Sequence, residues 1–248
     1  MKILIVEPFY TGSHKAWAEG YASSSSHEIK IISLPGRFWK WRMHGGAVTL
    51  ARMYMESKLQ PDLILTTDML DLTIFLSLTR SRTANIPTAV YFHENQLSYP
   101  WSSTDRDVGK KRNIHYGFIN YTTALTADHI FFNSQYHMNS FLTEALKMLK
   151  HFPDHNELET ISKITEKSSV LHLGLDLSRF DKHQCEKDSG TPLLLWNHRW
   201  EYDKNPEKFF NALEILSEKG LDFGTSRYCP EWSRNKYGER VMDIKAGN

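Results

Sequence analysis

The sequence has little cysteine, no long hydrophobic run and almost no net charge, and each lack excludes a class of protein. Its two cysteines, Cys185 and Cys229, lie far apart and without metal-ligand spacing. This argues against a disulfide scaffold and a zinc site, and it suits a reducing compartment. No apolar stretch approaches the ~20 residues of a spanning helix, and the run at residues 3–6 is too short for a signal peptide. We therefore expect a cytoplasmic protein, with the nucleus as the alternative, that binds no membrane.

The net charge of +1 excludes a global field that would attract nucleic acid, so any RNA contact must come from a local patch. The 248 residues suffice for one large domain or for one and a half ordinary ones. Hydrophobic residues make up 40% of the chain and charged residues 24%. This composition supports a sizeable core and a globular fold.

Glycine is scarce where a dinucleotide site would need it. An apolar strand expected at residues 3–6 is followed by a turn at 7–14 and a helix at 15–21, the front of a nucleotide-binding βαβ unit. The turn holds Gly12 alone rather than a G-x-G-x-x-G motif, so a nicotinamide or flavin oxidoreductase is disfavoured. The turn amides can still hold an anion; alternatively, Gly12 and Ser13 form a plain turn and N-cap.

Apolar runs that alternate with helical patterns predict an α/β fold with a parallel sheet. We expect the strand at residues 3–6 to be central, and the segment 152–167 to break the pattern. The next strand falls within residues 169–180. The core face of the helix at 47–59 is expected to carry Val48, Ala51, Met55 and Leu59. The other expected strands are 27–34, 61–68, 88–92 and 127–134, and the other expected helices are 69–79, 110–126 and 135–150.

Four consecutive polar side chains follow the expected strand at 88–92. His93, Glu94, Asn95 and Gln96 emerge at its carboxyl end, and ligands of open α/β sheets bind at that edge. Such side chains are costly to bury unpaired, so they are either solvated as a polar loop or serve a ligand. Asp68 ends the preceding strand in the same way; it either binds a ligand hydroxyl or caps the next helix.

Two segments combine cations in a way that suits RNA. Residues 38–42 interleave aromatic rings, which stack on bases, with Lys and Arg, which meet phosphates. We expect a loop there, in which Trp39, Trp41 and Arg42 bind the acceptor RNA. Asn95, from the polar run after residue 92, is expected to bind the acceptor as well. The alternative is that these tryptophans pack on the domain while the cations stay in water. The densest cation cluster is a second candidate, or else a solvated helix face; it consists of Lys110, Lys111 and Arg112.

The last third of the chain begins a second unit. A polar linker that contains proline and glycine, at 181–192, precedes a strand at 193–197 and a helix that starts at Pro206. Arg199 and Lys204 lie between them, and two cations beside a helix N-terminus suit a diphosphate. The alternative is surface charge on a connecting loop. Residues 224–248 are polar and aperiodic, so we expect no further strand there.

Several blocks together make the chain resemble the family-4-like glycosyltransferases of GT-B fold. The resemblance is greatest to the glycosyltransferase-like domain-containing group that includes tRNA-queuosine α-mannosyltransferase, and it spans roughly residues 1–223. The blocks that carry it are Glu7–Lys15, Trp39–Arg42, Tyr91–Pro100, Phe131–Ser134, Pro153–His155 and His198–Glu207.

The resemblance implies a retaining transferase that moves mannose from GDP-mannose to queuosine in a tRNA anticodon, with tRNA-Asp as the substrate tRNA. By analogy with the family, Gly12 approaches the donor diphosphate, and Arg199 and Lys204 neutralise it across a cleft. His93 contacts the transferred sugar or its phosphate, and Glu94 holds an acceptor hydroxyl. No metal ion and no cofactor are expected beside the nucleotide-sugar substrate.

The resemblance also implies a GT-B arrangement of two Rossmann-like domains, of which the second is incomplete. We expect an acceptor-side domain at 1–180, a linker at 181–192, the start of a donor domain at 193–223 and a divergent tail at 224–248. Because the rest of the donor domain is missing from the pattern, such a chain is expected to bind nucleotide sugar poorly and to transfer weakly. The alternative function is a non-catalytic tRNA-binding fragment.

Overall fold

The computed structural model describes residues 1–102, 105–109, 114–183, 190–198 and 200–227. The chain divides into two compact units, Met1–Leu175 and Asp176–Asn248, which are described separately. This division does not test the expected domain boundaries at 180 and 192, which stay predictions. Within the described ranges, no helix has the length and apolarity needed to cross a lipid bilayer.

Unit 1 is built on a six-stranded, all-parallel sheet with the order β2-β1-β3-β4-β5-β6. The predicted α/β fold with a Rossmann-like parallel sheet is therefore confirmed. The first strand, β1, is interior but not central, because β3 and β4 occupy the middle of the sheet. The strands are β1 (Lys2–Tyr10), β2 (Glu28–Pro35), β3 (Leu63–Thr67), β4 (Thr88–Phe92), β5 (His129–Phe132) and β6 (Ser168–Val170).

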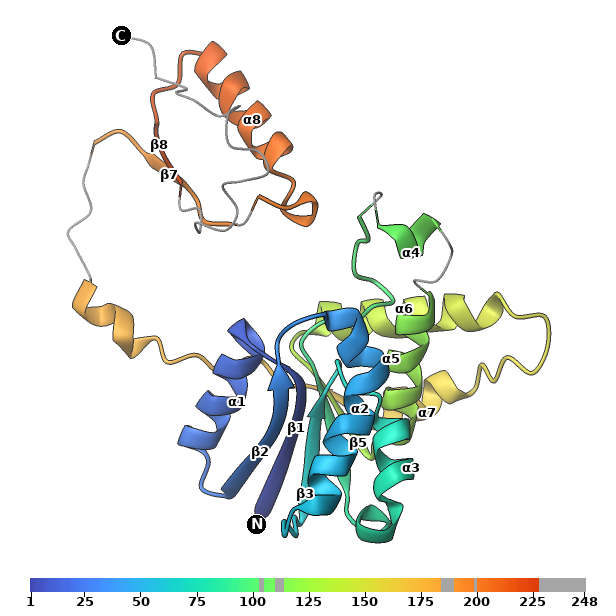
Figure 1. Cartoon of the computed structure of the whole chain (residues 1–248). Helices are drawn as coiled ribbons and strands as arrows, with labels where there is room; N and C mark the ends of the chain where they lie inside the picture. Colours follow the sequence, from blue (N-terminus) through green and yellow to red (C-terminus); the bar gives the residue numbers. More distant parts are fainter. Residues whose placement is uncertain (103–104, 110–113, 184–189, 199, 228–248) are drawn as a thin grey trace. The chain divides into compact units, whose positions relative to one another are not determined.

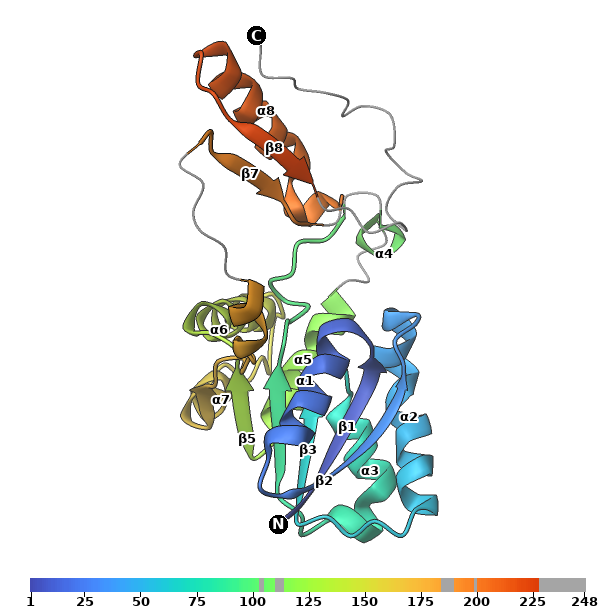
Figure 2. The same ribbon diagram turned by 90° about the vertical axis from the view of Figure 1, so that its left-hand side faces the viewer.

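Helices cover the two faces of this sheet unequally (Figure 1). α1 packs on one face with Ile3, Ile5 and Tyr91, whereas the other long helices pack on the opposite face around Leu4 and Phe92. Figure 2 shows α1 in front of the strands. The helices of unit 1 are α1 (Gly12–Ser24), α2 (Trp39–Glu56), α3 (Leu72–Thr83), α4 (Arg106–Gly109), α5 (Ile114–Thr126), α6 (Gln135–Lys150) and α7 (Thr160–Glu166).

β1 is longer than the sequence pattern predicted. Residues 7–10, expected in a turn, continue the strand, because Glu7 still pairs with Ser33 and Tyr10 with Pro35 of β2. The register shifts between Glu7 and Tyr10, the interval that holds Pro8. Proline has no N–H for the ladder, so a local irregularity there lets the pairing continue.

Helix α2 corrects two predictions. It begins at Trp39, so residues 39–42 form a helical turn rather than a loop, and it ends at Glu56. Its buried face contains Met43, Gly46, Ala47, Leu50, Ala51 and Tyr54. Of the four predicted core residues only Ala51 is fully buried, whereas Val48 is 52% and Met55 38% exposed. The small residues set this orientation: a Cβ on Gly46 would lie 3.2 Å from Pro8 Cβ, so the glycine permits close contact with β1.

The remaining elements of unit 1 follow the sequence with small corrections. β4 and α6 have the predicted bounds, and Ser134 caps α6 by accepting a hydrogen bond from the His137 backbone N–H at 3.2 Å. α3 begins at Leu72 rather than Met69, because Asp71 caps it. The segment that was expected to lack a pattern contains α7, whose buried Ile164 joins the main core.

Unit 2 contains a βαβ motif. β7 (Leu193–Trp196) leads to the 3₁₀ turn η2 (Tyr202–Lys204) and to α8 (Pro206–Glu218), with Pro206 in its first turn as predicted. β8 (Gly224–Arg227) then pairs in parallel with β7. The expectation of no strand after residue 223 is therefore wrong. The Gly-Thr-Ser-Arg sequence of β8 carries no apolar signal, and pairing with β7 defines it. The 3₁₀ helix η1 (Ser178–His183) precedes this motif.

Candidate functional site

The candidate site lies at the carboxyl edge of the unit 1 sheet, at the point where the strand order reverses between β1 and β3. Ligands of doubly wound sheets bind at such a point. Three side chains meet this edge: Glu7 near the end of β1, Asp68 directly after β3 and His93 directly after β4. His14 joins them from the first turn of α1.

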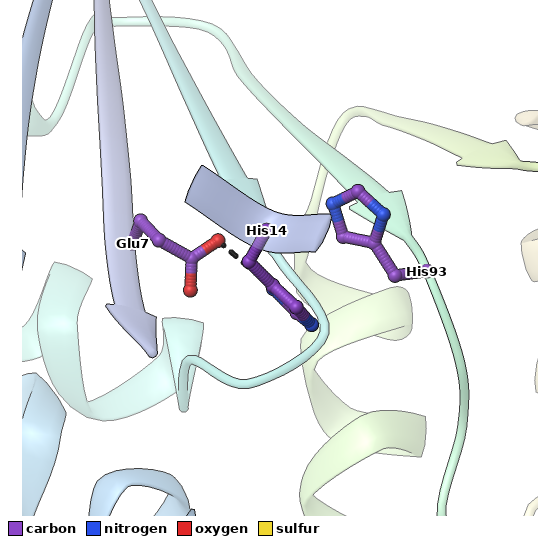
Figure 3. A group of neighbouring side chains, drawn as sticks. All are labelled: Glu7, His14 and His93. Atoms are coloured by element: carbon purple, nitrogen blue, oxygen red, sulfur yellow. Dashed lines mark hydrogen bonds and ion pairs between the residues drawn. The ribbon is translucent and has the colours of Figure 1, made fainter. Parts of the chain in front are cut away.

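Glu7 and His14 form a buried pair. Figure 3 shows Glu7 on β1 and His14 at the start of α1, joined across the edge, with His93 at the end of β4. His14 Nδ1 lies 3.1 Å from Glu7 Oε2, and the Phe9 backbone N–H donates to Glu7 Oε1 at 2.8 Å. Both carboxylate oxygens of the fully buried Glu7 are thus satisfied, which a buried carboxylate requires.

His93 stands beside this pair in an aromatic surround. Its ring centroid lies 4.4 Å from that of His14, and 4.9 Å from those of Trp17 and Tyr91. Its backbone N–H donates to Asp68 Oδ1 at 2.8 Å, and its carbonyl accepts from Asn133 Nδ2 at 2.8 Å. These two bonds fix the backbone where the strand ends.

The His93 side chain has an unused hydrogen-bonding atom. Among the described residues, its buried Nε2 has no hydrogen-bond partner. A buried polar atom of this kind calls for an explanation, and a ligand group is one.

The protonation states at this edge differ sharply between the two histidines. Burial lowers the pKa of His14, but its hydrogen bond to Glu7 and the charges of Asp68, Glu7 and Glu94 outweigh burial and raise it to about 9. Burial, reinforced by the charge of His14 and by His137, lowers the pKa of His93 to about 3. At neutral pH the site therefore pairs a cationic imidazole with a neutral one.

Asp68 is the third titratable group of the edge. Burial raises its pKa to about 7, against the opposing attraction of His14. Its side chain accepts the His93 backbone N–H, and it does not cap α3, because Asp71 does. Of the two roles considered for Asp68, the helix cap is therefore excluded.

A hydrogen-bond network holds the residues that follow His93. Gln96 Nε2 donates to Glu94 Oε1 at 3.2 Å, and the Gln96 backbone N–H donates to Asn120 Oδ1 at 2.7 Å. Asn120 Nδ2 in turn donates to the Asp68 carbonyl at 2.8 Å. Asn95 is buried, and its Oδ1 accepts the backbone N–H groups of residues 97 and 98. The polar run is therefore a turn fixed by hydrogen bonds rather than a solvated loop.

Gly12 opens helix α1 with a backbone φ of +50°, a conformation that strains any other residue. Thr11 precedes it as the N-cap but makes no side-chain cap hydrogen bond. The first N–H groups of α1 therefore lack the usual side-chain partner, and they start the helix that carries His14. Unpaired helix N-terminal N–H groups favour anions.

One group of side chains in the described part of the chain has the geometry of a metal site. The ligand atoms of Glu7, His14 and His93 lie within 4.8 Å of one another, and two histidines with a glutamate form a known zinc ligand set. Because its pKa is raised, His14 keeps its proton at neutral pH. A metal would have to displace this proton, since only neutral imidazole binds a metal. The expectation of no metal stays a prediction.

The proposed acceptor segment divides into packed and exposed parts. Trp39 packs against Trp101 and Tyr116, with ring centroids 5.7 and 5.2 Å apart. Trp41 is 64% exposed, and Arg42 Nε donates to the Pro35 carbonyl at 3.0 Å. Trp39 therefore packs on the domain, whereas Trp41 does not, and the RNA contact of this segment stays a prediction.

The remaining predicted cations are not placed relative to this edge. Lys110, Lys111, Arg112 and Arg199 lie outside the described residues. Lys204 belongs to unit 2 and pairs with Asp203 at 2.9 Å. The expectation that Arg199 and Lys204 face His93 across a cleft stays a prediction.

Sequence reasoning missed Glu7 and His14 as site residues. Both were assigned to a turn after a short strand, so nothing in the local pattern placed them on opposite sides of one edge. The available signal was the spacing: a glutamate at a strand end and a histidine seven residues later, in the first turn of the helix that follows.

Comparison with known proteins gives the family of this chain. The family model described as "tRNA-queuosine alpha-mannosyltransferase N-terminal" matches residues 2–175. The chain belongs to this family. It is also similar to the tRNA-queuosine alpha-mannosyltransferase of Drosophila melanogaster, with 35% identity over 230 residues. The aligned region covers 89% of this chain and 59% of the relative, so the chain spans less than two thirds of the relative's length. The resemblance drawn from the sequence is thereby confirmed.

Proposed function

We propose that this chain transfers mannose from GDP-mannose to queuosine in tRNA, with tRNA-Asp as the acceptor and with retention of configuration at the sugar. The observation that carries the proposal is the edge formed by Glu7, His14 and His93, which lies inside the segment that matches the family model. We further propose that it acts in the cytoplasm and without a metal ion.

The charges of the edge suit a reaction that releases a diphosphate. The C1–O bond to the diphosphate breaks, a C1–O bond to a queuosine hydroxyl forms, and the hydroxyl proton leaves with the diphosphate. His14, cationic at neutral pH, and the N-terminus of α1 at Gly12 attract the negative charge that develops on the leaving group. Arg199 and Lys204 are proposed to complete this neutralisation.

His93 is suited to the sugar rather than to the anion. Its low pKa keeps it neutral. Depending on the tautomer, Nε2 either accepts a hydrogen bond from a sugar hydroxyl or donates one to a phosphate oxygen. We assign it the sugar hydroxyl, because the neighbouring His14 already supplies the positive charge. Glu94, whose carboxylate accepts from Gln96, is assigned the acceptor hydroxyl.

A transfer assay tests this proposal. The 248-residue chain is incubated with radiolabelled GDP-mannose and tRNA that contains queuosine, and the same tRNA with guanosine at that position is the control. Label in the queuosine tRNA alone supports the function. Label in neither tRNA, with queuosine tRNA bound, points instead to the second candidate below.

The second candidate is a tRNA-binding protein that does not transfer sugar. It is favoured by one observation: the matched family model is that of an N-terminal part and ends at residue 175. Under this candidate Trp41→Ala and Arg42→Ala weaken salt-dependent tRNA binding while no transfer is seen in any variant.

A further inference from the structure

A cavity of about 290 Å³ opens in unit 1 beside the turn that follows His93. It lies between α5, α6 and the segment after β4, and it is separate from the Glu7–His14–His93 edge. Its lining is mainly apolar and includes Gln96, Leu97, Trp101, Gly117, Lys147 and Phe152. None of the roles assigned above uses it as a binding site.

We propose that this cavity binds one unstacked nucleobase of the acceptor RNA. This inference rests on the proposed function and adds to it a subsite for the acceptor. Proteins read single-stranded RNA by stacking splayed bases on aromatic side chains and by hydrogen-bonding their edges. The cavity offers both, because Trp101 and Phe152 present aromatic rings while Gln96 and His151 present polar atoms.

Neighbouring rings and a cation hold the Trp101 ring of the cavity in place. The Trp101 ring lies 5.7 Å from both Trp39 and Tyr116, and Lys40 Nζ lies 5.4 Å from its centroid. Lys40 also donates to Asp105 Oδ1 at 2.7 Å, which ties the segment that carries Trp101 to the first turn of α2. A fixed ring loses little conformational entropy when a base stacks on it.

The rim has charge that suits RNA. Glu144 forms an ion pair with Lys147 at 2.7 Å, which offsets its negative charge, and Lys150 is exposed on the last turn of α6. Among the described residues, the end of α6 beside the cavity thus carries two lysines against one glutamate, a balance that favours a polyanion.

A hydrogen bond links the lining of the cavity to the turn that follows His93. Gln96 lines the cavity, and the Gln96 side chain donates to Glu94, which follows His93 in the chain. A nucleotide held here would place its neighbouring atoms beside the turn that carries both catalytic candidates. We therefore assign the cavity to positioning the acceptor rather than the sugar donor.

Gly117 gives a way to change the cavity without removing its aromatic wall. A Cβ at this position would lie 2.6 Å from Leu97 Cδ2, so alanine must push Leu97 out of its place at the cavity. Alanine also favours the helix, since glycine in a helix interior is destabilising relative to alanine. We therefore expect Gly117→Ala to alter the cavity in a chain that still folds.

The test measures binding of anticodon stem-loop RNAs to the full 248-residue chain by fluorescence anisotropy. One hairpin carries queuosine, and others carry an abasic site at the queuosine position or at each flanking loop position. We expect Trp101→Ala and Gly117→Ala each to weaken binding of the intact hairpin on the order of ten-fold, the scale of one lost base–aromatic stack. Matched controls are Tyr136→Ala, 82% exposed on α6, and Gly20→Ala, whose Cβ meets nothing within 4 Å.

A double-mutant cycle separates a base contact from a structural effect. If a base occupies the cavity, one abasic position weakens wild-type binding but adds nothing to Trp101→Ala. Additive effects at every abasic position, or no binding of any hairpin by the wild type, overturn the inference. Because binding is measured without GDP-mannose, a failure of mannose transfer does not affect this result. If the chain transfers mannose but Trp101→Ala and the abasic positions act additively, the base-binding role of the cavity is rejected and the proposed function is not.

Discussion

Replacing Glu7 by glutamine removes the carboxylate that holds the charge of His14. Glutamine keeps the shape and can still accept the Phe9 backbone N–H, so the main loss is the interaction at 3.1 Å with His14 Nδ1. His14 has a pKa of about 9 in the folded chain, against about 6.5 for an ordinary histidine. Each tenfold change in proton affinity is worth about 1.4 kcal/mol, so the surroundings of His14 together stabilise its charged form by about 3 kcal/mol, and the hydrogen bond to Glu7 is the largest favourable contribution.

The contribution has a definite pH dependence. A histidine whose pKa is raised by folding stabilises the fold fully below its unfolded pKa of about 6.5. That stabilisation is lost as the pH rises through about 9. We therefore expect Glu7→Gln to lower the free energy of unfolding by about 3 kcal/mol at pH 6 and by little at pH 9.5.

The assay is urea denaturation of both proteins from pH 6 to 9.5, with NMR titration of the histidine ring signals. Glu19→Gln is the matched control, because Glu19 is an exposed carboxylate on α1 that bonds Tyr10, and exposed pairs contribute little. A difference that stays constant across this pH range, or a wild-type His14 that titrates near 6.5, refutes the reasoning.

Three further predictions concern the same edge. His93→Ala should lower kcat of mannose transfer roughly ten- to hundred-fold with tRNA affinity unchanged, because a lost hydrogen bond in the transition state is worth about 1.5–3 kcal/mol; a change in tRNA affinity alone would contradict the sugar assignment. Asn120→Ala should lower the free energy of unfolding of unit 1, measured in denaturant, by about 2–5 kcal/mol, because it leaves the Gln96 backbone N–H and the Asp68 carbonyl without their partners at 2.7 and 2.8 Å. Asn139→Ala, at an exposed position, should have almost no effect. EDTA should leave transfer unchanged; a loss that zinc restores would assign a metal to the three candidate ligands.

The strands and helices that the sequence predicted well are those whose pattern is local. β4 has the predicted bounds because five buried residues follow a proline, and α6 because Ser134 caps a clear helical periodicity. The phase of α2 could not be predicted in this way. Small residues at Gly46 and Ala47 give no strong hydrophobic signal, yet their close contact with β1 decides which face is buried.

The candidate site shows the same division. His93 and Glu94 were found from the sequence, because polar residues directly after a buried strand must reach the carboxyl edge of a parallel sheet. Their partners were not found. Asp68 and Asn133 bond the His93 backbone from 25 and 40 residues away, and Asn120 bonds the Gln96 backbone from 24 residues away. Only the packing of their elements brings these residues together.

The amino-acid sequence alone determined the fold class, the family and the strand whose end carries His93, because hydrophobic periodicity and motif order are properties of neighbouring residues. Tertiary structure decided what the edge can do. It buried Glu7 against His14 and so kept one imidazole charged, and it buried His93 beside that charge and so kept the other neutral. A pKa depends on burial and on the charges nearby, and both are set by the packing of β1, α1, β3 and β4 rather than by any stretch of sequence.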